Sequence, residues 1–123
     1  MRYMSMVKMA EDIGPAPQAL SEAMGADMAA AFADGRVLDA GGLCGMKEAV
    51  EISLRDGTVT TVDGPYTEAK EVAGGYAIID VRSHEEAVAA ARRVIELHKE
   101  HWPGWEGSVE LRRIADPEMP PGA

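Results

Sequence analysis

The stretch that decides the fold reads DGPYTEAKEVAGGYAIIDV and occupies residues 63–81. Its second part, residues 76–81, has the alternation of a strand, with apolar side chains on both faces. Residues 2–9 show the same two-sided pattern. Because a strand with two apolar faces has to be covered on both sides, we expect the sheet that holds these strands to have two apolar surfaces to bury.

Two predicted helices cover one of these surfaces. The first spans residues 18–33, where apolar side chains recur at helical spacing, and Gly35 stands where a glycine commonly ends a helix. Its methionines are expected to fill the core. Gly25 costs this helix about 1 kcal/mol relative to alanine, which a close approach to the sheet would explain. Ser83 and Glu86 form an S-x-x-E capping box that predicts the start of the second helix.

The remaining strands are predicted at residues 36–40, 50–55, 58–62 and 108–114. Within residues 50–55, apolar and polar side chains alternate, which is typical of a half-buried strand. Asp56 and Gly57 predict a type I′ hairpin turn after it, because this pair tolerates the positive φ that the turn requires. The element order is that of an α+β protein, a ferredoxin-like βαββαβ frame with an extra β-hairpin.

The second apolar surface of the sheet has no covering element left in the chain. The simplest cover is another copy of the same sheet, related by a two-fold axis, so we predict a homodimer. We expect one domain over residues 1–115. Residues 116–123 contain three prolines and a glycine and are predicted to form a flexible C-terminal tail.

Composition excludes several function classes. A net charge of −9 opposes binding to nucleic acid or to an anionic membrane. Cys44 is the only cysteine, so no intramolecular disulfide can form, and with no targeting segment in sight we expect a cytoplasmic protein. His98 and His101 share a helix face, but with no third histidine or cysteine in reach by sequence we expect no metal site and no cofactor. His98 itself is expected to be a satisfied core or rim histidine.

The loop at the start of the quoted stretch is the candidate site. Asp63 is the candidate catalytic residue, either as a general base or, alternatively, as a carboxylate that only pins the turn by accepting backbone N–H groups. Tyr66 either donates a hydrogen bond to a ligand oxyanion or acts as an aromatic plug. If the site is catalytic, Tyr66 or Lys70 would stabilise developing negative charge. The predicted ligand-binding residues are Gly64, Pro65, Tyr66, Lys70 and Tyr76.

These residues also carry a resemblance. The order Asp63-Gly64-Pro65-Tyr66, then Gly74-Gly75-Tyr76 and a strand, resembles the DGPF subgroup of the YCII-related proteins, with Tyr66 in place of the usual Phe. The resemblance extends over nearly the whole chain and implies a dimeric α+β barrel. A histidine and aspartate pair has been proposed as catalytic in YCII proteins, the histidine lying in the first half of the chain. That pair cannot be carried over, because no histidine precedes His84 here.

Two functions follow from this resemblance. Small-molecule chemistry in relatives with the same barrel implies a homodimer that binds a small molecule in a pocket between sheet and helices, near Asp63, with acid–base chemistry as one use of that site. The alternative is a non-enzymatic regulatory or interaction module, because DGPF proteins often look like companions of extracytoplasmic-function sigma factors. The sequence leaves open whether the protein is an enzyme.

Overall fold

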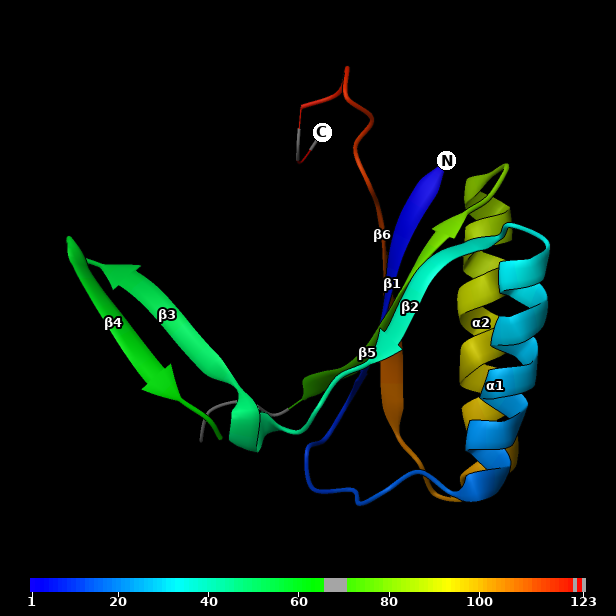
Figure 1. Ribbon diagram of the computed structural model, residues 1–123, viewed down its shortest axis with the longest axis horizontal. Coiled ribbons are helices and arrows are strands. Elements are labelled where there is room, and N and C mark those ends of the chain that lie inside the picture. Colours follow the sequence, from blue (N-terminus) through cyan, green and yellow to red (C-terminus); the bar gives the residue numbers. More distant parts are fainter. Residues whose placement is uncertain (66–70, 121, 123) are drawn as a thin grey trace.

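The computed structural model describes residues 1–65, 71–120 and 122. It consists of a four-stranded sheet with two helices on one face and a two-stranded hairpin that projects away from them (Figure 1). In chain order the elements are β1 (Arg2–Met9), α1 (Gln18–Ala33), β2 (Val37–Gly42), the 3-10 helix η1 (Met46–Glu48), β3 (Val50–Arg55), β4 (Thr58–Asp63), β5 (Val72–Asp80), α2 (His84–His101) and β6 (Gly107–Arg113).

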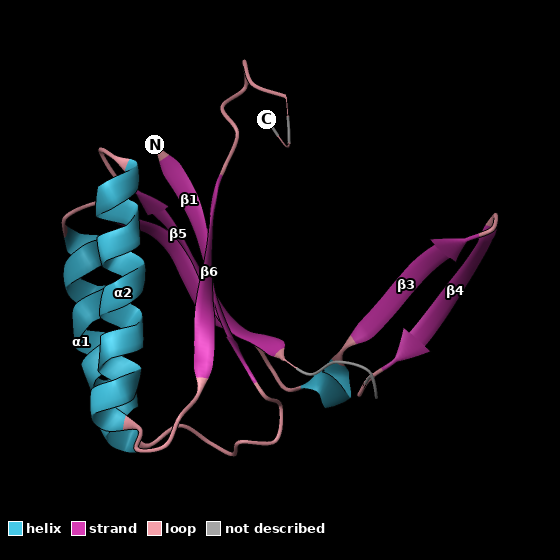
Figure 2. Ribbon diagram, turned by 180° about the vertical axis from the view of Figure 1, so that it is seen from behind, coloured by secondary structure: helices cyan, strands magenta, loops and turns pink. Residues whose placement is uncertain are grey.

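The main sheet has the strand order β2-β5-β1-β6, and each neighbouring pair is antiparallel. Without the hairpin, this is the order of a ferredoxin-like βαββαβ fold. Figure 2 shows α1 and α2 together on one side of the sheet. The predicted α+β class and the predicted element order therefore agree with the structure.

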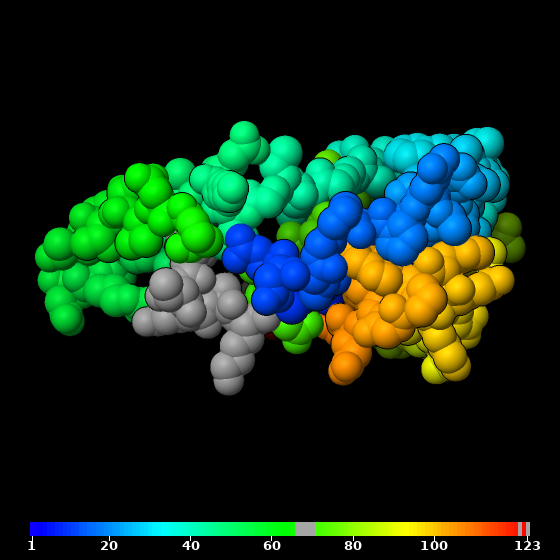
Figure 3. All heavy atoms as spheres, turned by 90° about the horizontal axis from the view of Figure 1, so that it is seen from below, coloured from blue at the N-terminus to red at the C-terminus, as the bar shows by residue number. Residues whose placement is uncertain are grey.

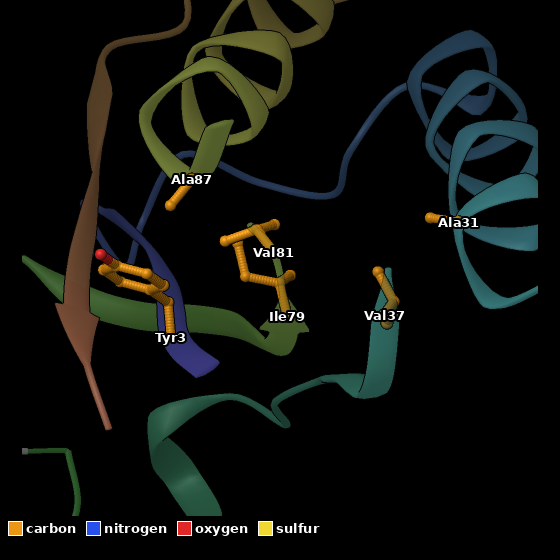
Figure 4. Close-up of a cluster of buried hydrophobic side chains, with 6 residues drawn as sticks. All are labelled: Tyr3, Ala31, Val37, Ile79, Val81 and Ala87. Atoms are coloured by element: carbon orange, nitrogen blue, oxygen red, sulfur yellow. The ribbon is translucent and has the colours of Figure 1, made fainter. Parts of the chain in front are cut away.

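The register of the central strands sorts their side chains between the two faces of the sheet. Tyr3 pairs with Ile79, and both are buried on the side of the helices. Met4 pairs with Ile78 and Met6 pairs with Tyr76, and alternation puts these four side chains on the opposite face. The core lies on the helix side, where Figure 4 shows the buried cluster of Tyr3, Ala31, Val37, Ile79, Val81 and Ala87.

The helix ends follow from local sequence. Gly35 has φ 82° and its N–H donates to the carbonyl of Phe32, so the predicted glycine stop of α1 is confirmed. At the start of α2, the Ser83 hydroxyl accepts the N–H of Glu86 at 3.1 Å. The Glu86 carboxylate accepts the N–H of Arg82 instead of that of Ser83. The capping box is therefore only half formed, and the second half caps one residue earlier.

Gly25 does not approach the sheet, contrary to the expectation from sequence. The residue is exposed, and a Cβ built there would have no atom within 4 Å. The close approach of glycine backbone occurs instead in β5. There, a Cβ at Gly74 would lie 2.8 Å from the Cε methyl of Met9. The strand begins at Val72, four residues before the predicted start at Tyr76, and both glycines lie within it.

The hairpin of β3 and β4 has the predicted turn but not the predicted burial. Asp56 and Gly57 have φ 50° and 76°, the positive values that a type I′ turn needs. However, Ile52 and Leu54 are each 68% exposed, so β3 is not half-buried within this chain. The reason is the placement of the hairpin, which projects away from the main sheet and pairs with none of its strands (Figures 1 and 2).

Candidate functional site

A cavity of about 640 Å³ lies between the helix side of the sheet and the two helices. It extends toward the end of the molecule at which residues 10–17 connect β1 to α1, the end that faces the viewer in Figure 3. Small-molecule sites in proteins typically enclose about 300–1,000 Å³. The cavity is therefore of the size that holds one small ligand.

Most of the cavity wall is apolar. Residues of α1 form one side and strands of the main sheet form the other. The principal apolar lining residues are Val7, Met9, Leu20, Met24, Met28, Phe32, Val72 and Val94. Met24 and Met28, expected from the sequence to be core filler, thus have one side on the cavity. Such flexible, polarizable side chains adapt their shape to what they contact.

Few polar side chains interrupt this wall. Ser5 and His98 are the buried ones, with 8% and 4% of their surface exposed. Cys44 also lines the cavity but is exposed at its edge. A largely apolar wall with a few fixed polar groups is the usual composition of a small-molecule site, in which the polar groups set the orientation of the ligand.

His98 is held in a defined orientation by its own helix and by the chain that follows it. Its Nδ1 lies 2.8 Å from the carbonyl oxygen of Val94, one turn earlier in α2. Its ring packs against the indole of Trp105, with ring centroids 4.4 Å apart. The expectation of a satisfied core or rim histidine therefore holds for Nδ1, while the lining of a cavity by this ring was not foreseen.

Tyr76 is the predicted site residue that the structure places at the cavity. Its hydroxyl donates to the carboxylate of Asp39 on the neighbouring strand β2, at 3.3 Å. The edge of the phenol also lies close to Gly41, where a Cβ would be 3.1 Å from Cε1 of the ring. Tyr76 is thus fixed against β2, and its phenol lies on the face of the sheet opposite the helices, so the ring does not point into the space between sheet and helices.

Asp63, Gly64 and Pro65 are at the end of β4 and are not among the residues that line the cavity. The Asp63 side chain is exposed. The N–H of Gly64 donates to the carbonyl of Ala49 at 2.7 Å and ties the end of the hairpin to the segment that precedes it. The other two predicted ligand-binding residues, Tyr66 and Lys70, lie outside the described residues.

The described part of the chain contains no group of three or more His, Cys, Asp or Glu side chains placed to hold a metal ion. His101 lies beside Glu100, with 3.8 Å between Nε2 and a carboxylate oxygen, and His98 turns into the protein. Among the helices described here, none has the length and apolar character needed to cross a membrane.

A four-stranded antiparallel sheet, two helices on one face and a cavity between the layers define a ferredoxin-like α+β protein with room for a small molecule. The YCII-related domain matches residues 1–102 of the chain. The protein therefore belongs to the YCII-related family. No curated protein matches it.

Proposed function

We propose that this protein binds a small, mostly apolar molecule between its sheet and its helices. The observation that carries the proposal is the cavity of about 640 Å³, with its apolar wall and its two buried polar side chains, Ser5 and His98. Burial of an apolar ligand against such a wall contributes about 25 cal/mol for each Å² removed from water. Membership of the YCII-related family is compatible with this role but does not specify a ligand.

We further propose a homodimer in which two sheets face each other as a dimeric α+β barrel. The face opposite the helices has an apolar centre formed by the pairs Met4 with Ile78 and Met6 with Tyr76. Lys8 and Glu110 form an ion pair of 3.2 Å at its border. Apolar centres with a charged border are typical of protein interfaces, and a two-fold axis would let the same face cover itself.

The hairpin supports the same proposal. Its apolar residues include Ile52, Leu54 and Val59, and each of them is at least two-thirds exposed. A two-stranded hairpin on its own is at best marginally stable in water, so its apolar face needs a cover. The second copy of the chain is the cover we propose, because the two arms of a symmetric dimer can be buried at once.

Acid–base chemistry at Asp63 is part of this proposal only within the dimer. Inside one chain, Asp63 is exposed and does not line the cavity. A role of Asp63 as proton acceptor therefore requires that the end of β4 meet a cavity wall of the second copy. Tyr66 or Lys70 would then stabilise the developing negative charge. Membership of the DGPF subgroup would add support for a role of this loop.

The exposed hairpin also favours a second function. An arm with an apolar face is a common way to bind another protein. A regulatory or interaction module, for example an accessory of extracytoplasmic-function sigma factors, would use β3 and β4 for its partner and would need no ligand in the cavity. The two functions differ in whether the cavity is used.

Binding of 1-methylindole, followed by isothermal titration calorimetry, tests the use of the cavity. We expect saturable binding of one molecule per chain. Met24→Trp should weaken it at least tenfold by filling the space, whereas Ala29→Trp should leave it unchanged, because Ala29 is exposed on the same helix and does not line the cavity. Absence of saturable binding, or equal affinity in both variants, would contradict ligand binding at this site.

A further inference from the structure

His98 is a buried residue in the wall of the cavity. The side chain is 4% exposed, yet the residue contributes to the cavity wall together with Val94 of the same helix and Trp102, which follows the helix end. Trp105 Nε1 is the only fully enclosed side-chain nitrogen or oxygen without a hydrogen-bond partner among residues 1–65, 71–120 and 122. No described residue bonds to Nε2 of His98, so this nitrogen is not fully enclosed. Because the residue lines the cavity, we infer that Nε2 faces it.

The hydrogen bond at the other ring nitrogen determines what Nε2 can do. The carbonyl oxygen of Val94 can only accept, so Nδ1 at 2.8 Å has to carry the proton of that hydrogen bond. In a neutral imidazole, the second nitrogen is then an acceptor with a free lone pair. Packing against Trp105 at 4.4 Å restrains the plane of the ring, and the hydrogen bond to Val94 favours the orientation with Nδ1 toward the helix. The fold thus fixes both the orientation and the tautomer of His98.

The charges around the cavity restrict what such an acceptor would bind. No lysine or arginine is among the described residues that line it, and Glu11 is at its rim. The chain as a whole carries a net charge of −9. An anionic ligand would therefore lose its hydration without gaining a cationic partner, which is costly in an apolar site. A neutral molecule with a hydrogen-bond donor meets no such cost.

From these observations we propose that Nε2 of His98 is a ligand-binding hydrogen-bond acceptor, which selects neutral, mostly apolar molecules that carry one O–H or N–H donor. This proposal rests on the proposed function of the cavity and names the ligand class and the residue that recognises it. The apolar wall takes the body of the ligand, and His98 fixes the end that carries the donor. A ligand without the donor leaves Nε2 unpaired, and so binds more weakly.

Indole and 1-methylindole form a matched pair of probes, because a methyl group replaces the N–H donor and both molecules are neutral. At a pH of about 8, above the ordinary titration range of histidine, calorimetry on the wild-type chain should give about tenfold tighter binding of indole, the size of one hydrogen bond. His98→Phe keeps an aromatic ring beside Trp105 but removes the acceptor, and should abolish the preference. His101→Phe, on the same helix but outside the cavity wall, should retain it.

Equal binding of the two probes to the wild-type chain would overturn the role of His98 and leave the cavity proposal intact, whereas binding of neither would overturn both. If His98→Phe still prefers indole to 1-methylindole, the proposed role of His98 would also be overturned. If that variant does not fold, ¹⁵N spectra of the histidine rings in the wild-type chain test the role of His98 instead. We expect the Nδ1–H tautomer at His98 and a shift of its Nε2 resonance with indole but not with 1-methylindole, and an Nε2–H tautomer would contradict the proposal.

Discussion

A side chain on Gly64 would collide with the carbonyl oxygen of Met46, because the backbone after β4 passes directly against the short helix η1. The N–H of Gly64 donates to the carbonyl of Ala49 at 2.7 Å, so the end of the hairpin is tied to the residue before its start. The glycine of the Asp-Gly-Pro-Tyr motif is therefore required for backbone packing at the base of the hairpin, independently of any chemistry at Asp63.

Gly64→Ala should lower the free energy of unfolding by about 1–3 kcal/mol, the usual cost of forcing atoms into an occupied space. The loss should appear in urea denaturation and in faster hydrogen exchange of the amide at position 64. Gly45→Ala is the matched control, because its Cβ would meet nothing within 4 Å and its φ is −63°. Equal stability of the two variants would show that the contact with Met46 does not constrain the hairpin.

A substitution at Gly25 should stabilise the protein, in contrast to the one at Gly64. Gly25 lies in the interior of α1, is exposed, and has open space where a Cβ would be. Gly25→Ala should therefore raise the free energy of unfolding by about 0.5–1 kcal/mol, because alanine loses less backbone entropy in a helix. Thermal unfolding followed by circular dichroism measures the change. A destabilised variant would mean that this glycine makes a close contact, for example with a second copy of the chain.

The elements of this fold could be predicted from the sequence where local signals decide them. Residues 18–33 form a helix with the predicted ends, and Asp56-Gly57 makes the predicted turn. The predicted half-burial of residues 50–55 is not seen within one chain, because alternation shows that the two faces of a strand differ in polarity but not what covers either face. The predicted turn and the two predicted strands of the hairpin are present, but the hairpin is separate from the main sheet.

The candidate site was less predictable, since it depends on residues that are distant in the sequence. Asp63 was predicted as the candidate catalytic residue because it is a carboxylate in the Asp-Gly-Pro-Tyr motif, but it is not among the residues that line the cavity. His98 appears in the sequence as one more residue on the inner face of a helix. Its place in the cavity wall depends on the return of the chain after α2, which brings Trp105 against its ring.

Asp34 provides a prediction for pH dependence. The side chain of Arg36 donates to its carboxylate at 2.7 Å and the Arg36 backbone N–H donates at 3.0 Å, and these bonds hold the pKa of Asp34 below its ordinary value of 3.8. A carboxyl group whose pKa is lowered by folding adds stability above its unfolded pKa, and this stability is lost as the pH falls through the folded pKa. At a pH below both the folded and the unfolded pKa, the ionisation of Asp34 contributes no stability.

Arg36→Gln should therefore raise the pKa of Asp34 toward its ordinary value, as ¹³C titration of the carboxyl group would show. Salt should weaken the effect, because the pair is exposed and its charges are screened by ions. Arg55→Gln serves as the control, since Arg55 lies at the far end of the hairpin and should leave the titration of Asp34 unchanged. An unaltered pKa in Arg36→Gln would mean that the ion pair does not persist in solution.

The apolar face of the hairpin predicts which surface holds two copies together. Leu54 pairs with Val59 across the hairpin, and the two side chains share one face, whereas Thr60 pairs with Ser53 on the other. In the proposed dimer the first face is buried against the second copy. Leu54→Glu would then place a charge in an apolar interface, where it has no partner, and should weaken dimerisation at least a hundredfold.

Sedimentation equilibrium over a range of protein concentrations measures this change. Thr60→Glu adds the same charge to the opposite, exposed face of the same strand pair and should leave the dimer intact. If Leu54→Glu and Thr60→Glu dissociate equally, charge repulsion and not the apolar face controls assembly. If the wild-type chain is monomeric at every concentration, the apolar surface of the sheet opposite the helices is not covered by a second copy, and a different protein has to be sought as the partner of the hairpin.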